Sequence, residues 1–333
     1  MDPEKPNIGS DSYSSSKLTG YVLIISAATM WGLAAAAAKF LFNKSFDVFL
    51  VVQTRSLMSC IVLWIFFLSF RRRSIRKLNF RQWYPFALLG ICGIAGSNWT
   101  YYKAMQLRNV STAIILQYTA PILVMLYEVL RKRDTLSPYN VSALALSLLG
   151  CYLTVGGYYA LLGHMNIEGL LWAILSAFVF AFFNLYGKNV LTKYTAWTGM
   201  LYSITFTSLF WFLFRPPWSL IGSNISLHDW GVLFIFAMCS ILIPYSLYFQ
   251  GLKLIRSSHA IIIATLEPIV ASVSAAFIVN ELLTGWQYMG AACVIAAIVI
   301  LSKHHEREIT RWIDTSTPAA FGAQYFIAEE NSG

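Results

Sequence analysis

Two charged side chains and one amide lie inside long apolar segments of this sequence. Glu267 stands in "ATLEPIV", near the middle of the apolar run 257–280, Arg55 stands in the run 46–70, and Gln117 stands in the run 109–127. An ionised group in the core of a bilayer costs several kcal/mol unless it is paired, hydrated or neutralised. Each of these residues therefore needs a chemical reason for its position.

Glu267 is the deepest acidic residue and the first candidate for chemistry. Helical spacing puts it on one stripe with small residues, namely Ala260, Ala264, Ala271 and Ser274. Small residues let another backbone approach or leave room for a ligand. The carboxyl group could therefore bind an ammonium group or exchange protons in a cavity. The alternative is a structural hydrogen bond to a neighbouring helix.

Arg55 and Gln117 also have two interpretations each. Arg55 could neutralise Glu267 or bind a substrate carboxylate, or it could extend to the lipid headgroups. Gln117 could bind a ligand or join two helices by a hydrogen bond. We take both as candidate substrate contacts.

Four aromatic residues and one amide complete the candidate substrate site: Trp31, Asn98, Trp99, Tyr101 and Tyr248. Aromatic clusters of this kind recur in two parts of the chain, around 98–102 and around 244–248. We expect some of these side chains to line a pathway. Because aromatic residues are also common anchors at the membrane interface, anchoring is the alternative.

Pro121 and Pro268 interrupt two of the apolar runs. Proline cannot donate a hydrogen bond to the carbonyl four residues earlier, here those of Gln117 and Ala264. We therefore expect a helix break at each proline, either shaping a central site or serving as a hinge.

Neither a metal ion nor another cofactor is expected. The five cysteines all lie in apolar runs without CxxC or Cys/His spacing. An HExxH motif, a paired-aspartate metal motif and a readable Ser/His/Asp grouping are all missing, which argues against the rival class of a membrane-embedded lipid enzyme. A Walker motif is missing too, so we do not expect ATP to drive the protein.

The composition indicates which elements must position these residues. The chain has 333 residues, of which 57% are hydrophobic and 12% charged, with a mean hydropathy of +0.60. That is too apolar for a soluble fold. A bilayer core about 30 Å thick needs roughly 20 helical residues. We therefore predict an all-α integral membrane protein with ten transmembrane helices, over 18–38, 46–70, 82–102, 109–127, 138–161, 167–187, 194–214, 230–252, 257–280 and 282–302.

The net charge of +9 reflects basic residues in alternate connecting segments rather than a nucleic-acid-binding patch. Alternate connecting segments hold 18 Lys and Arg residues on one side and 5 on the other. By the positive-inside rule both termini are cytoplasmic, and the basic excess faces anionic lipid. We predict a multi-pass protein of the inner membrane that binds no nucleic acid.

An internal repeat organises the chain. With an offset of 147, "YYKAMQLRNVSTAIILQYTAPIL" (101–123) aligns with "YFQGLKLIRSSHAIIIATLEPIV" (248–270), and Pro121 meets Pro268. Each half then holds five helices, and an odd number places the second copy upside down in the membrane. We expect two inverted repeats, at 18–163 and 164–303, between a disordered cytoplasmic N-terminus (1–17) and a cytoplasmic tail (304–333).

The second half resembles the EamA family of the drug/metabolite transporter superfamily. The resemblance rests on "AIIIATLEPIVASVSAAFIVNELLTGWQYMGAACVIAAIVIL", on "AIILQYTAPILVMLYEVLRKRDTLSPYNVSALALSLLGCYLTVGG" in the first half, and on "MWG" at 30–32. It covers roughly residues 18–303. In one departure, Asp134 stands where the first repeat of the family usually carries a glutamate.

The resemblance and the inverted repeat together imply a secondary transporter. We expect it to move small metabolites such as amino acids or their derivatives, in the export direction, by alternating access around a central cavity. An ion-independent facilitator or channel is the alternative. The expected partners are a small-molecule substrate, the lipid bilayer and protons as a candidate coupling ion, with the protein a monomer or a dimer.

Overall fold

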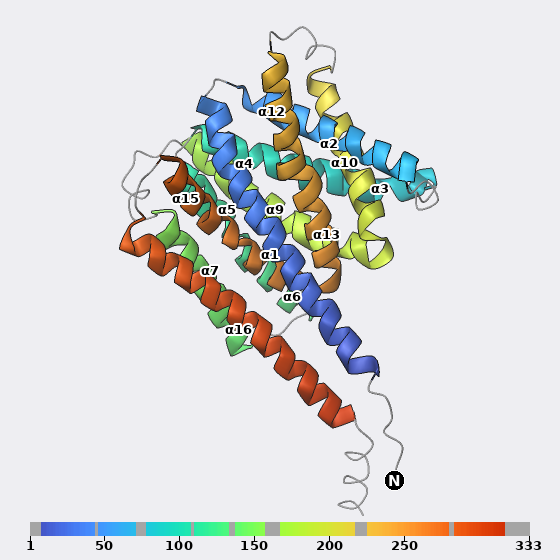
Figure 1. The fold of residues 1–333 in the computed structure, drawn as a ribbon. Coiled ribbons are helices and arrows are strands. Elements are labelled where there is room, and N and C mark those ends of the chain that lie inside the picture. The colour runs from blue at the N-terminus through green and yellow to red at the C-terminus, as the bar shows by residue number, and fades with distance from the viewer. Residues whose placement is uncertain are drawn as a thin grey trace, which may run out of the picture.

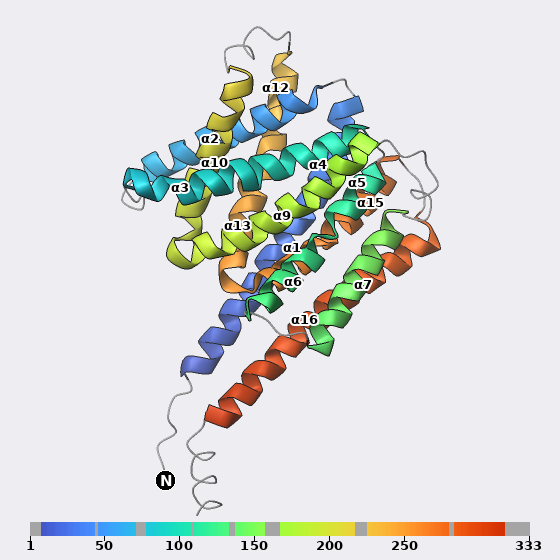
Figure 2. The same cartoon turned by 180° about the vertical axis from the view of Figure 1, so that it is seen from behind.

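The computed structural model describes residues 8–43, 46–70, 78–107, 110–132, 137–156, 167–216, 225–279 and 283–316. Within these ranges all regular structure is helical (Figure 1, Figure 2). The predicted turn between the fifth and sixth spans, near 156–166, lies mostly outside the described residues, as do 1–7 and 317–333. Residues 8–17 and 304–316, expected beyond the spans, continue the first and last helices.

The helices follow one another in two series. The first series comprises α1 (Ile8–Asn43), α2 (Val48–Phe70), α3 (Phe80–Leu88), the π-helix η2 (Leu89–Ala95), α4 (Gly96–Leu107), α5 (Val110–Gln117), α6 (Ala120–Leu130) and α7 (Pro138–Thr154). The second comprises α9 (Ile167–Lys193), α10 (Ala196–Phe214), α12 (Leu227–Ala237), the π-helix η3 (Met238–Leu242), α13 (Ile243–Leu254), α14 (Ser257–Ala264), α15 (Leu266–Val279) and α16 (Gly285–Ser316).

Eight helical stretches in the described part of the chain are long and apolar enough to cross a membrane. They correspond to eight of the ten expected spans, and the protein is a multi-pass, all-helical membrane protein. The expected spans 82–102 and 138–161 are not among the eight. The first is divided into α3, η2 and α4, and α7 supplies 17 residues of the second. The count of ten remains a prediction.

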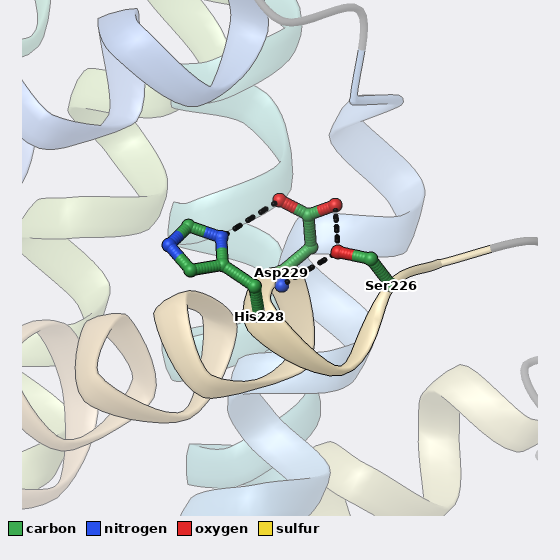
Figure 3. Close-up of polar contacts among 3 residues, drawn as sticks. All are labelled: Ser226, His228 and Asp229. Atoms are coloured by element: carbon green, nitrogen blue, oxygen red, sulfur yellow. Dashed lines mark hydrogen bonds and ion pairs between the residues drawn. The ribbon is translucent and has the colours of Figure 1, made fainter.

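Polar side chains fix the starts of equivalent helices in the two series. Ser226 begins α12, where its hydroxyl accepts from the backbone N–H of Asp229 at 3.1 Å and donates to the Asp229 carboxylate at 2.7 Å (Figure 3). His228 lies 3.6 Å from the other carboxylate oxygen. Asn79 begins α3 in a capping box with Gln82, 147 residues earlier. These caps satisfy N–H groups that the first turn of a helix leaves unpaired.

Two further irregularities recur at equivalent places. The π-helices η2 and η3 lie within the third and eighth predicted spans. The fourth and ninth predicted spans are each interrupted, at Tyr118–Thr119 between α5 and α6 and at Thr265 between α14 and α15. At each interruption a threonine hydroxyl donates to the carbonyl three residues back, at 2.7 Å for Thr119 and 2.6 Å for Thr265. These bonds occupy carbonyls where the regular ladder is broken.

Packing between the series is reciprocal. Helix α1 packs against α13 and α15, and its counterpart α9 packs against α4, α5 and α6. Helices α7 and α16 form a pair along one side of the molecule, visible in both views (Figure 1, Figure 2). Their backbones touch at Gly150 and Gly290, because a Cβ on Gly150 would lie 2.6 Å from the Gly290 carbonyl oxygen. Glycine is required for this close approach.

Candidate functional site

A cavity lies between the two series of helices, at the level of the interrupted helices. Its free volume in this conformation is about 50 Å³, room for a few water molecules. Its lining comes from α1, α2, α4 and α5 of the first series and from α9, η3, α13 and α15 of the second. The lining residues are Trp31, Ala34, Ala35, Arg55, Ser97, Asn98, Tyr101, Tyr102, Gln117, Phe180, Ser240, Tyr245 and Glu267.

Arg55 presents a buried guanidinium group to this cavity. Its side chain is only 2% exposed. One terminal nitrogen donates to the Tyr102 hydroxyl at 2.7 Å, the other donates to the Asn98 amide oxygen, and the guanidinium carbon lies 4.7 Å from the Tyr102 ring centre. These neutral partners orient the group without cancelling its charge. The geometry excludes a position in the lipid headgroups, which the sequence had left open.

Glu267 occupies the opposite series and faces the same cavity. Its carboxylate accepts a hydrogen bond from the Tyr118 hydroxyl at 2.7 Å. Tyr118 is fully buried, and it lies in the interruption between α5 and α6. The bond therefore joins the two broken helices across the molecule. Although Arg55 and Glu267 line one cavity, no ion pair joins them.

Several polar atoms of the cavity wall have no hydrogen-bond partner in the described part of the chain. They are Arg55 Nε, the Tyr101 hydroxyl, Gln117 Oε1 and Ser240 Oγ. Burying such a group without a partner costs roughly 1–3 kcal/mol, and more for a charged one. A ligand that supplied both hydrogen-bond donors and acceptors would recover this free energy.

Two adjacent residues of the "MWG" segment make different contacts. Trp31 lines the cavity, with its ring centre 5.1 Å from that of Tyr245 and 4.9 Å from that of Tyr248. Gly32 packs against α15, where a Cβ would lie 2.6 Å from the carbonyl oxygen of Glu267. The missing side chain therefore lets α1 approach the backbone that carries the acid.

Six of the eight residues singled out from the sequence meet at the cavity: Trp31, Arg55, Asn98, Tyr101, Gln117 and Glu267. The other two lie behind its wall. Trp99 faces α2 and α10, and its ring centre lies 5.9 Å from the ring centre of Phe49 and 5.7 Å from that of Trp211. Tyr248 is fully buried, and its hydroxyl donates to Asn184. Neither side chain is among the residues that line the cavity in this conformation, because neighbouring positions on a helix point in different directions.

Sequence reasoning missed Tyr118, which orients Glu267, and Ser240, which lines the cavity. Tyr118 follows Gln117 directly, yet a tyrosine in an aromatic-rich chain gives no signal that its hydroxyl meets an acid in the other half. Ser240 lies within η3, where the helical period itself changes. π-Helical turns often occur at functional sites, but this sequence gave no sign of one.

The two prolines lie just after the interruptions. Pro121 is in the first turn of α6, and Pro268 is in the first turn of α15. A proline is tolerated in the first turn of a helix because the N–H there needs no intrahelical partner. Among the described residues no group of three or more His, Cys, Asp or Glu side chains could hold a metal ion. Asp134 lies outside the described residues.

Comparison with known proteins places the chain among membrane transporters. The sequence profile of the EamA-like transporter family matches twice, over residues 18–156 and over residues 167–303. The chain belongs to the EamA-like transporter family. The two matches coincide with the two series of helices, so the family profile describes one series at a time.

The relatives of this EamA-like protein carry transporter names. The uncharacterized inner membrane transporter YicL of Salmonella typhimurium is 21% identical over 86% of this chain and 96% of its own length. The threonine/homoserine exporter RhtA of the same species is 24% identical over 74% of this chain and 79% of its own length. A solved structure, described only as the crystal structure of a protein, superimposes with a TM-score of 0.69 at 17% identity, over 88% of this chain and 98% of that one.

Proposed function

We propose that this EamA-like protein is a secondary transporter that exports small zwitterionic metabolites, amino acids or their derivatives, by alternating access around the described cavity. The observation that carries the proposal is that Arg55 and Glu267, from opposite series of helices, both line one cavity without an ion pair between them. Retaining two buried charged groups without a direct ion pair between them is costly. A ligand of complementary charge offsets that cost.

The cavity offers one pole for each charge of a zwitterion. Arg55 provides a planar donor group with an unpartnered Nε, which suits a carboxylate. Glu267 provides an acceptor for an ammonium group, and the unpartnered Gln117 Oε1 adds a second acceptor in the same cavity. Trp31, Phe180 and Tyr245 supply apolar surface for a side chain. Among the relatives, the RhtA proteins are named as threonine and homoserine exporters, which supports this substrate class.

The reciprocal packing of the two series supports alternating access. Both halves contribute an interrupted helix, and the Tyr118–Glu267 bond ties the two interruptions together. In transporters built from inverted repeats, broken helices near mid-depth form the site and the halves rock around it. We propose that Pro121 and Pro268 keep these breaks open, and that both termini face the cytoplasm. Transport without ion coupling remains the competing mechanism.

Transport by purified protein in proteoliposomes tests the function. The panel contains labelled amino acids together with analogues that lack either the amino or the carboxyl group. We expect Arg55→Met and Glu267→Gln each to reduce amino-acid transport by at least about tenfold, the cost of one charged hydrogen bond. Glu168→Gln on the exposed start of α9 is the matched control. Full transport in both cavity variants, or lipid turnover by the wild-type protein, would refute the proposal.

A further inference from the structure

One end of the molecule is closed by polar contacts between the two series of helices. The Tyr21 hydroxyl of α1 lies 2.6 Å from His259 Nδ1 of α14, and it also lies 3.4 Å from the Leu301 carbonyl oxygen of α16. The backbone N–H of Ser258 donates to the Glu128 carboxylate of α6 at 3.2 Å. Tyr21, Glu128, Ser258 and His259 are all buried. We call these four residues the latch.

Three of the latch residues are separated from cavity-lining residues by similar numbers of residues along the chain. Trp31 lies ten residues after Tyr21, Gln117 lies eleven before Glu128, and Glu267 lies eight after His259. At 1.5 Å per helical residue these separations correspond to about 12–17 Å. The space between is filled by fully buried side chains such as Ile24, Ala27 and Ile263. Buried residues thus lie between the cavity and the latch on α1 and α14 in this conformation.

Backbone contact reinforces the closure beside the latch. A Cβ on Gly20 of α1 would lie 2.7 Å from the Ile255 side chain, and one on Gly251 of α13 would lie 2.9 Å from the Gly20 carbonyl oxygen. Two glycines thus bring α1 and α13 into direct contact. Opening this end requires these helices to separate and the latch bonds to break.

The repeat-related positions do not carry the latch residues. In the first helix of each half the offset is 149, which pairs Gly20 with Gly169 and Tyr21 with Leu170. With the offset of 147, Glu128 pairs with Ala275 and His259 with Thr112. A leucine and an alanine cannot form the two bonds that Tyr21 and Glu128 make. If the two halves exchange conformations, Leu170 and Ala275 therefore cannot reproduce the two latch bonds at the other end.

We propose that the latch biases the resting transporter towards the conformation closed at this end, which the charge distribution predicts to be cytoplasmic. Opening to the cytoplasm then requires breaking the latch, and this step must precede the entry of an exported substrate from that side. The inference rests on the proposed function, because a gate needs a pathway. The bias itself is measurable without transport.

Amide hydrogen exchange of the full-length protein in lipid nanodiscs tests the latch. The first N–H groups of a helix have no intrahelical acceptor, so protection of the Ser258 amide depends on Glu128. We expect exchange over 256–262 to become roughly tenfold faster in Tyr21→Phe and in Glu128→Ala. Glu128→Gln keeps an acceptor oxygen and should restore most of the protection. Tyr288→Phe, at a tyrosine that is 61% exposed, is the matched control.

Exchange at the opposite end distinguishes a gate from general loosening. Residues 225–233 should exchange at the wild-type rate in every variant that folds. If exchange over 256–262 is unchanged in Tyr21→Phe and in Glu128→Ala, or if 225–233 accelerates equally, the latch is refuted. Failure of the wild-type protein to transport any substrate would instead refute the proposed function and leave the exchange result standing.

Discussion

At the residue scale, the protein holds two opposite charges apart at one cavity. Arg55 is oriented by Asn98 and Tyr102, and Glu267 is oriented by Tyr118, so each charged group has neutral partners from the first series. A direct ion pair would leave no charge for a ligand to meet. The proposed zwitterionic substrate rests on this separate orientation of the two groups.

Gly32 provides a residue-scale prediction. A Cβ there would lie 2.6 Å from both the Glu267 carbonyl oxygen and the Val270 Cβ, so Gly32→Ala must push α1 away from α15. We expect a loss of about 1–3 kcal/mol in stability, the usual cost of overpacking, and weaker transport because Trp31 and Glu267 shift together. Thermal unfolding and transport assays measure the two effects.

Gly231 supplies the control for this substitution. It lies in α12, and a Cβ there would meet nothing within 4 Å. Gly231→Ala should therefore leave both stability and transport near wild type. Equal effects of the two substitutions would contradict the packing explanation.

The residue types of the site could be predicted from sequence more fully than its geometry. A charged or amide group inside an apolar run is costly, and that cost singled out Arg55, Glu267 and Gln117. No comparable cost marks Tyr118, whose role follows from a contact with a residue 149 positions away. Trp99 and Tyr101 looked equivalent in the sequence, although only Tyr101 faces the cavity, because helix rotation is set by packing.

At the element scale, Lys188 of α9 forms hydrogen bonds with the C-terminal end of α13. Its ammonium group donates to three backbone carbonyls at the end of α13, those of Leu252 at 2.8 Å, Lys253 at 3.1 Å and Ile255 at 2.7 Å. The last carbonyls of a helix lack intrahelical partners and carry partial negative charge. Lys188 therefore joins α9 to α13 beside the latch.

The substitution Lys188→Met tests this joint, because methionine keeps the apolar stem and removes the ammonium group. We expect a loss of about 1–3 kcal/mol in stability from the carbonyls left unsatisfied. Lys193→Met, at an exposed lysine of the same helix, is the control. Thermal unfolding in nanodiscs measures both variants, and equal unfolding temperatures would show that the three bonds do not stabilise α13.

At the scale of the whole molecule, two copies of one helical unit surround a site that is not symmetric. The matching caps, π-helices and interruptions come from sequence that recurs at an offset of 147, which is why the repeat could be found without a structure. The residues that we propose for substrate binding and gating include several that differ between the two copies. Glu267 stands opposite Ala120, and the latch residues Tyr21 and Glu128 stand opposite Leu170 and Ala275.

The most direct test of alternating access is the labelling of one cavity residue from each side of the membrane. Ser240 lines the cavity, is 3% exposed, and has no hydrogen-bond partner among the described residues. The variant Ser240→Cys, in a background whose five native cysteines are serine and which still transports, is treated with a membrane-impermeant thiol reagent from either side.

We predict that Ser240→Cys reacts mainly from the side opposite the latch. Adding Tyr21→Phe and Glu128→Ala should raise the rate of labelling from the latch side by about tenfold and lower the rate from the other side. Equal labelling from both sides that does not respond to the latch substitutions would indicate an open channel. That result, or protection of Ser240→Cys from both sides, would contradict the account.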